Sequence, residues 1–297
     1  MANDAGTVAR IRSALEARGL DASGLSPVGV RPSIPLYLQE LWDRRHFLWM
    51  DSRHRVASQN SRNRLGKLWL LLRPLLDAAF YFLVFGLVLD IQGRVENYAA
   101  FLIIGILSFQ AMSRTLTQGP NLIYNSRAMI RAFSFPRIAV PLSFQLREAL
   151  QLVPTMLVML VVIAVIPPFV TPTWTWFLMV PILALQLVVN LGISLILARF
   201  GSRFPDSTQV MGFISRVAMY ASGVIFPLEN FITHSTAAAV LSLNPLYRII
   251  DMLREVLMEG TIPSAESWLI VLIWAAGLVL VGFVYFWRGE ATYGGDE

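Results

Sequence analysis

Residues 268–287 read WLIVLIWAAGLVLVGFVYFW, an uncharged apolar run long enough to cross the hydrocarbon core of a bilayer as one helix. The whole chain of 297 residues is 56% hydrophobic and only 14% charged. Ordinary soluble domains contain about 25% charged residues. A soluble protein of this length could not bury so much apolar surface. The sequence therefore predicts an all-α integral membrane protein, and the length of its apolar runs argues against a membrane β-barrel.

Five further windows have the length and composition of a membrane-spanning helix, which gives six predicted spans. The six predicted spans, including the run already quoted, are 68–89, 98–116, 141–166, 174–198, 210–227 and 268–287. With the N-terminus in the cytoplasm, seventeen Lys and Arg residues fall in cytoplasmic segments and three in external ones. This positive-inside bias predicts a multi-pass protein of the cytoplasmic (inner) membrane with both termini inside. The formal charge of +5 is therefore a topology signal and no indication of nucleic-acid binding.

The spans divide the chain into four regions. A small, polar N-terminus that is expected to be mobile precedes an interface helix with a basic segment; the six-span domain and a short cytoplasmic tail follow. The regions are 1–32, 33–67, 68–287 and 288–297. Within the membrane domain, loop 117–137 is cytoplasmic and segment 228–266 is external.

Residues 36–52, LYLQELWDRRHFLWMDS, carry a stripe of Leu and Trp residues at helical spacing. Arg45 interrupts the stripe, but its long side chain can reach out of an apolar surface. Tryptophans flanked by arginines are typical of a helix lying in the membrane interface. The alternative is a helix packed on another protein domain.

The external segment 228–266 contains a second helical pattern, LSLNPLYRIIDMLREVLMEG at 241–260. Asn244 can cap this helix, and Pro245 suits its first position. The helix carries too many charges to span a membrane. We expect short re-entrant helices that dip into the outer leaflet or lie on it. The alternative is a plain external helix packed across the spans.

Catalytic and cofactor motifs are absent from the sequence. The only Gly-Lys pair, Gly66-Lys67, is followed by Leu68 and does not fit a phosphate-binding loop. The chain has no cysteine, and its three histidines are scattered. The sequence therefore predicts no enzyme, no metal site and no cofactor in this chain.

Polar residues within the predicted spans are expensive in a bilayer and mark a pathway or a pair. Three pairs are spaced four apart, so that each lies on one helix face: Arg73 with Asp77, Gln110 with Arg114, and Gln186 with Asn190. Arg73 and Asp77 either neutralise each other or mark a pathway. Arg216 has no partner in its own span, so it faces protein or water and can line a pathway. Candidate channel-lining residues are Tyr81, Phe85, Gln110, Arg216 and Tyr220, although most aromatic residues in spans contact lipid or pack.

Four motifs occur in a diagnostic order. They are SRNRLGKLWLLLRPLL at 61–76, GPNLIYNSRAMIRAFSFPRIAVPL at 119–142, VIFPLEN at 224–230 and LNPLYRIIDMLRE at 243–255. This order resembles the permease subunit of ABC-2 type polysaccharide exporters, the group that handles O antigen, teichoic acid and mycobacterial galactan. The resemblance covers about residues 33–290. The long, Arg-rich N-terminal region is most similar to the galactan exporters of actinobacteria.

The resemblance implies a dimer of permeases with two separate ABC ATPase subunits, which bind the ATP and Mg. It implies that loop 117–137 contains the coupling helix that docks on the ATPase, through Asn121, Tyr124, Arg127, Met129 and Arg131. Apolar Ile123, Ile130 and Phe133 of this loop are expected to be buried in the same contact. The implied cargo is a glycan on a polyprenyl diphosphate. Cations near the cytoplasmic entrance are candidates for binding the diphosphate: Arg62, Arg64, Lys67 and Arg73.

Two other functions remain open at the level of sequence. The chain could be an ABC-2 permease for a drug or a lipid, or a stand-alone membrane enzyme. Loss of activity without an ATPase partner would separate a permease from an enzyme.

Overall fold

The computed structural model describes residues 13–15, 17–18, 34–58, 65–88, 97–132, 135–165, 167, 169–227 and 241–293. Every regular element within these ranges is helical, which confirms the predicted all-helical class for the described residues. The N-terminal region 1–32, predicted to be mobile, lies almost wholly outside them.

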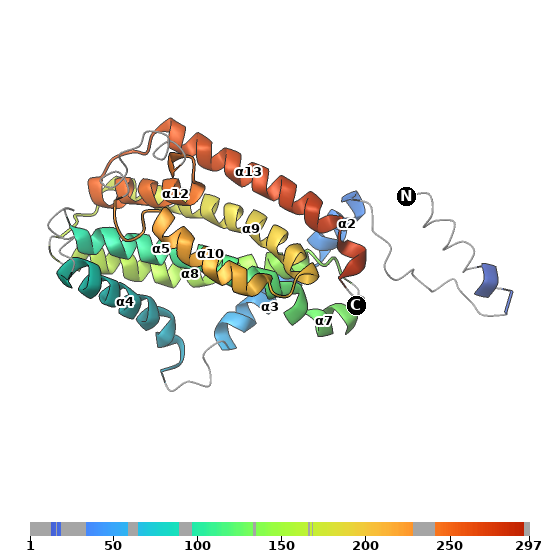
Figure 1. Ribbon diagram of the computed structural model, residues 1–297. Coiled ribbons are helices and arrows are strands. Elements are labelled where there is room, and N and C mark those ends of the chain that lie inside the picture. Colours follow the sequence, from blue (N-terminus) through green and yellow to red (C-terminus); the bar gives the residue numbers. More distant parts are fainter. Residues whose placement is uncertain are drawn as a thin grey trace.

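Four long helices coincide with predicted spans and are apolar and long enough to cross a membrane. They are α5 (Tyr98–Gln118), α8 (Ala139–Val165), α9 (Met179–Arg203) and α13 (Ala265–Trp287). In Figure 1 these helices run side by side as one elongated bundle. Length and composition thus confirm four of the six windows as candidate spans.

The two remaining windows are helical but shorter. Helix α4 (Trp69–Tyr81) continues into a π-helix, η2 (Phe82–Val88), and α10 (Ser207–Ala221) has 15 residues. At 1.5 Å per residue, α10 extends roughly 22 Å, which is less than the roughly 30 Å of a bilayer core. It ends before Gly223, whose φ of 62° is left-handed. The count of six spans therefore stays a prediction.

Helix α5 lies at the centre of the bundle and contacts α4, α8, α9 and α10. Most of its side chains are buried, including Leu102, Ile104 and Leu107. Its N-terminal half, residues 98–109, is almost wholly apolar and requires neighbours on all sides, which explains its central place.

Helices α9 and α13 pack with their backbones in contact. A Cβ atom on Gly192 of α9 would lie 2.5 Å from the backbone carbon of Leu278 in α13. A Cβ atom on Gly282 of α13 would lie 2.6 Å from the carbonyl oxygen of Gly192. Small residues at facing positions permit this close approach, as in other membrane helix pairs.

The interface segment is broken into two helices, α2 (Ile34–Asp43) and α3 (Arg45–Ser58), rather than one continuous helix. The guanidinium of Arg45 donates a hydrogen bond to the carbonyl oxygen of Trp42 at 3.0 Å and lies over the Trp42 ring. Arg45 is exposed, as a side chain reaching out of the stripe would be, and it also satisfies a carbonyl group at the end of α2. Most of the predicted stripe is exposed, but Leu48 is buried.

Helix α12 (Pro245–Arg254) packs against α5, α9 and α13, and the following π-helix η7 (Glu255–Glu259) packs against the short 3-10 helix η5 (Trp174–Leu178). Asn244 caps α12 as predicted, since its side chain accepts a hydrogen bond from the Leu246 amide at 3.0 Å. Arg254 turns into the bundle, where it donates to the carbonyl oxygens of Phe101 and Val224 at 3.2 and 3.1 Å. Residues 228–240 lie outside the described ranges, so the re-entrant form stays a prediction.

Candidate functional site

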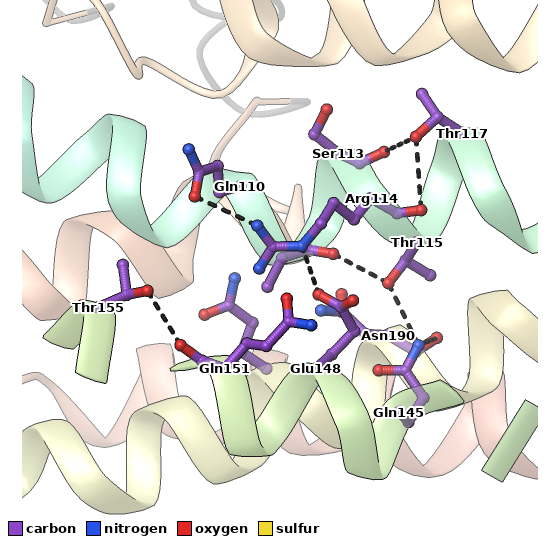
Figure 2. Close-up of polar contacts among 12 residues, drawn as sticks. Gln110, Ser113, Arg114, Thr115, Thr117, Gln145, Glu148, Gln151, Thr155 and Asn190 are labelled. Carbon is purple, nitrogen blue, oxygen red and sulfur yellow. Dashed lines mark hydrogen bonds and ion pairs between the residues drawn. The ribbon is translucent and has the colours of Figure 1, made fainter. Parts of the chain in front are cut away.

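The central helix α5 carries a stripe of polar residues, Gln110, Ser113, Arg114 and Thr117, along one face. The Arg114 Nε atom donates to Glu148 of α8 at 2.5 Å, and its Nη1 atom donates to Gln110 at 3.2 Å. Figure 2 shows Arg114 and Glu148 pointing toward one another from the two helices. The side chain of Glu148 is 2% exposed, whereas that of Arg114 is 26% exposed. The pair thus leaves one edge of the guanidinium accessible.

Two buried charges in an apolar bundle require each other. Removing a carboxylate or a guanidinium from water costs several kcal/mol, and only good geometry and further hydrogen bonds offset that cost. Arg114 meets both conditions through Glu148 and Gln110. We call Arg114, Glu148 and Gln110 the electrostatic centre, because they form a largely buried ion pair with a supporting hydrogen bond.

A second polar layer joins α5, α8 and α9 behind the pair. The Gln145 side-chain amide donates to the Thr115 hydroxyl and to the main-chain carbonyl oxygen of Asn190, both at 3.2 Å. One turn earlier in α9, the Gln186 side-chain amide donates to the main-chain carbonyl oxygen of Ser108 at 2.7 Å. These side chains are buried, so the layer fixes the register of three helices.

Helix α10 lies on the other side of α5. Ser215 and Ser113 share a hydrogen bond of 2.9 Å, and the Tyr81 hydroxyl of α4 donates to the Met219 sulfur at 3.7 Å. Arg216 and Tyr220 lie on the exposed part of α10. No ion pair to Arg216 forms within the described part of the chain, and its side chain is exposed.

The channel-lining candidates thus divide into three groups. Gln110 belongs to the polar stripe, Tyr81 is half-buried between α4 and α10, and Arg216 and Tyr220 are exposed. Phe85 lies in η2, and its side chain is outside the described part of the structure. Whether these residues line one channel stays a prediction.

The comparisons with known proteins decide the family. Residues 53–258 match the ABC-2 type transporter family, "ABC2_membrane", over more than half of the chain. The chain belongs to the ABC-2 type transporter family. Membership in this family implies an ABC ATPase as partner.

Named relatives align over most of this ABC-2 transporter chain. The O-antigen export system permease protein RfbA of Myxococcus xanthus is 25% identical over 248 residues, which are 82% of this chain and 94% of RfbA. RfbA of Klebsiella pneumoniae is 27% identical over 199 residues, 67% of this chain and 74% of that protein. The polysialic acid transport protein KpsM of Escherichia coli is 22% identical over 218 residues, 71% of this chain and 81% of KpsM.

The predicted entrance cations of this ABC-2 protein precede and begin α4. Lys67 lies in a short 3-10 helix, η1 (Gly66–Leu68), and Arg73 lies within α4. The side chains of both residues are outside the described part of the structure, and so are residues 62 and 64 altogether. Diphosphate binding by Arg62, Arg64, Lys67 and Arg73, and the pairing of Arg73 with Asp77, therefore stay predictions.

The predicted coupling loop forms three short helices, η4 (Gly119–Asn121), α6 (Leu122–Asn125) and α7 (Arg127–Ala132). Tyr124, Arg127 and Arg131 are exposed, and the Arg127 guanidinium lies 5.0 Å from the centre of the Tyr124 ring. Met129 is half-buried. An exposed cationic surface thus exists on this loop.

The predicted burial of Ile123 and Ile130 in a partner is wrong. These side chains are 2% and 7% exposed and pack within the chain. The side-chain oxygen of Asn121 accepts a hydrogen bond from the Thr208 hydroxyl at 3.0 Å. Phe133 lies outside the described residues.

Three hydrogen bonds, here called the latch, connect α2 with the C-terminal tail and with the F-P-R motif, Phe135-Pro136-Arg137. The Tyr37 hydroxyl donates to Glu290 at 2.7 Å and accepts from the Ile138 amide at 3.0 Å. The Arg137 amide donates to the other oxygen of Glu290 at 2.9 Å. Burial raises the pKa of the Glu290 carboxyl, although these hydrogen bonds oppose the shift. The sequence alone does not predict this latch, because its parts are more than a hundred residues apart.

Proposed function

We propose that this chain is the transmembrane subunit of an ATP-driven exporter that moves a polysaccharide linked to polyprenyl diphosphate across the cytoplasmic membrane. The observation that carries the proposal is the alignment over 94% of an O-antigen export permease and 81% of a polysialic acid transport protein. The Arg-rich N-terminal region favours a galactan as the glycan. The chain itself is no enzyme, and ATP hydrolysis takes place in the partner subunit.

In this proposal α4 with η2 and α10 complete six spans, with both termini in the cytoplasm. Two copies of the permease associate with two copies of the ATPase. The outward faces of α4, η2 and α10 expose large apolar side chains such as Phe80, Leu83 and Phe213, which suit contact with a second copy or with lipid. The cargo then passes beside α4, α5 and α10, where the polar stripe and the exposed Arg216 and Tyr220 lie.

The proposed contact that couples this chain to the ATPase lies on its cytoplasmic side. Tyr124, Arg127 and Arg131 are exposed and suit contact with an ATPase surface of opposite charge. The Glu290 carboxylate accepts hydrogen bonds from both the Tyr37 hydroxyl of α2 and the Arg137 amide of the F-P-R motif. In this proposal the latch transmits a movement of the coupling helices to α2.

The diphosphate part of the proposal predicts a specific role for Arg64. Arg64→Lys keeps the charge that orients the chain but loses the fork that binds phosphate with two parallel hydrogen bonds. We expect normal insertion and export reduced about tenfold or more, corresponding to one charge-assisted contact of about 1.5–3 kcal/mol. The measurement is surface polymer together with lipid-linked polymer retained inside the cell.

The matched control is Arg203→Lys, an equal change at an exposed position at the end of α9, away from the predicted entrance and from the proposed ATPase contact. Its effect on retained polymer should be small. Export at the wild-type rate by a normally inserted Arg64→Lys protein would exclude bidentate capture at this position.

A further inference from the structure

A polar pocket of about 230 Å³ lies where the interface helix, the coupling helices and the base of α8 converge. Asp51 and Arg55 of α3 line it, together with Gln118 at the end of α5, Ser126 between α6 and α7, and Ser143 and Arg147 of α8. Figure 1 shows α3 and α7 near one another at this end of the bundle. The pocket is distinct from the polar stripe and from the predicted entrance residues.

The charges in the pocket are unbalanced. The Arg55 Nε atom contacts both oxygens of Asp51, at 2.9 and 2.8 Å, so these two charges offset each other. Arg147 lies over the ring of Phe144, with 5.3 Å between its guanidinium carbon and the ring centre. No ion pair or hydrogen bond to Arg147 forms within the described part of the chain, although Glu148 and Asp51 act on it electrostatically. Two arginines against one aspartate leave the lining with a net positive charge, and the half-buried Arg147 lies in the same pocket as the Ser126 hydroxyl and the Gln118 amide.

The position of α2 and α3 indicates what reaches this pocket. Their exposed side chains include Trp42, Phe47, Trp49 and Met50, a composition that suits the boundary between headgroups and acyl chains. Arg55 of α3 and Arg147 of α8 both line the pocket. In the proposed orientation, with α2 and α3 at the inner-leaflet surface, the pocket lies at the level of the lipid headgroups.

We propose that the pocket binds the phosphodiester of an anionic membrane phospholipid. A phosphodiester carries one negative charge, which matches the net positive charge of the pocket lining, and its oxygens accept from arginine, hydroxyl and amide groups. One carboxylate already paired with arginine is a poor basis for a cation site. The bound lipid would connect the interface helix to the coupling helices. The proposal rests on the inner-leaflet placement of α3 in the proposed function but not on the identity of the cargo.

The test uses the full chain, purified and placed in nanodiscs of phosphatidylcholine with increasing phosphatidylglycerol, and counts retained lipid by native mass spectrometry. We expect preferential retention of phosphatidylglycerol. Arg147→Gln should weaken it about tenfold or more, because a charge-assisted contact is lost. Arg131→Gln removes the same charge from an exposed site outside the pocket and should change retention less than twofold.

Asp51→Asn provides a test in the opposite direction. It removes the carboxylate charge and so raises the net positive charge of the lining, and retention of phosphatidylglycerol should rise severalfold. A merely structural role for Asp51 predicts no such gain. An unchanged or weakened affinity in the folded Asp51→Asn protein would contradict the proposal.

A labelling experiment leaves the charged residues intact, in case Arg147→Gln folds poorly. Met129 lines the pocket, and the chain has no cysteine, so Met129→Cys introduces a single thiol there. We expect phosphatidylglycerol, but not phosphatidylcholine, to slow its reaction with a soluble thiol reagent. Equal protection by both lipids, or equal losses for Arg147→Gln and Arg131→Gln, would overturn the site. Protection by millimolar inorganic phosphate or only by a bound ATPase subunit would assign the pocket to a soluble phosphate or to the partner.

Discussion

Replacement of Arg114 by alanine is expected to lower the free energy of unfolding by about 3–5 kcal/mol, because it leaves the Glu148 carboxylate buried without its counter-charge. Glu148 is 2% exposed, so water cannot replace the guanidinium. Glu148→Ala should be less damaging, since Arg114 keeps Gln110 and an exposed edge. The loss of monodisperse protein after heating in detergent measures both effects.

The double variant Arg114→Leu with Glu148→Leu separates stability from transport. Replacement of a buried ion pair by apolar residues of similar size is often neutral for stability or stabilising. We expect the double variant to recover most of the stability but not export, because the polar stripe loses its only charge on α5. A double variant as unstable as Arg114→Ala would show that the two residues do not act as a pair.

Substitution of Gly192 by alanine is expected to destabilise the membrane domain by about 1–3 kcal/mol, because the new methyl group would overlap the backbone of α13. No rotation of a side chain can relieve this overlap, since the nearest atoms are the backbone carbon of Leu278 and the amide nitrogen of Val279. The two helices must therefore move apart. The midpoint of thermal inactivation, followed by size-exclusion chromatography, measures the change.

Gly277→Ala is the matched control on α13. A Cβ atom on Gly277 meets nothing within 4 Å, so alanine there should be neutral or slightly stabilising through its higher helix propensity. Equal midpoints for Gly192→Ala and Gly277→Ala would contradict the close packing of α9 and α13.

Hydropathy was sufficient to predict the main helices, because a run such as 268–287 has few structural alternatives. It was less informative for α10, where Gly223 ends the helix after 15 residues and the apolar letters continue to Pro227. Similarly, the apolar stripe at 36–52 predicted one helix, but it contained no signal for the break at which Arg45 binds the Trp42 carbonyl.

The electrostatic centre was only half predictable. Gln110 and Arg114 are four apart, and that spacing placed them on one face of a helix. Their partner Glu148 lies on another helix, 34 residues from Arg114, and only tertiary packing brings the two together. The same limit explains the error at Ile123 and Ile130: apolar residues in a cytoplasmic loop can pack on their own chain as well as on a partner.

The central claim is that this permease carries a lipid-linked polysaccharide outward with energy from a separate ATPase. The most direct measurement is depletion of the chain in its source organism, followed by quantification of lipid-linked polymer on each side of the cytoplasmic membrane. The account predicts that polymer accumulates inside and declines outside. The wild-type chain should restore export, but not when the ATPase partner is inactivated. Unchanged polymer on the outer side after depletion, or export restored without ATP hydrolysis, would contradict it.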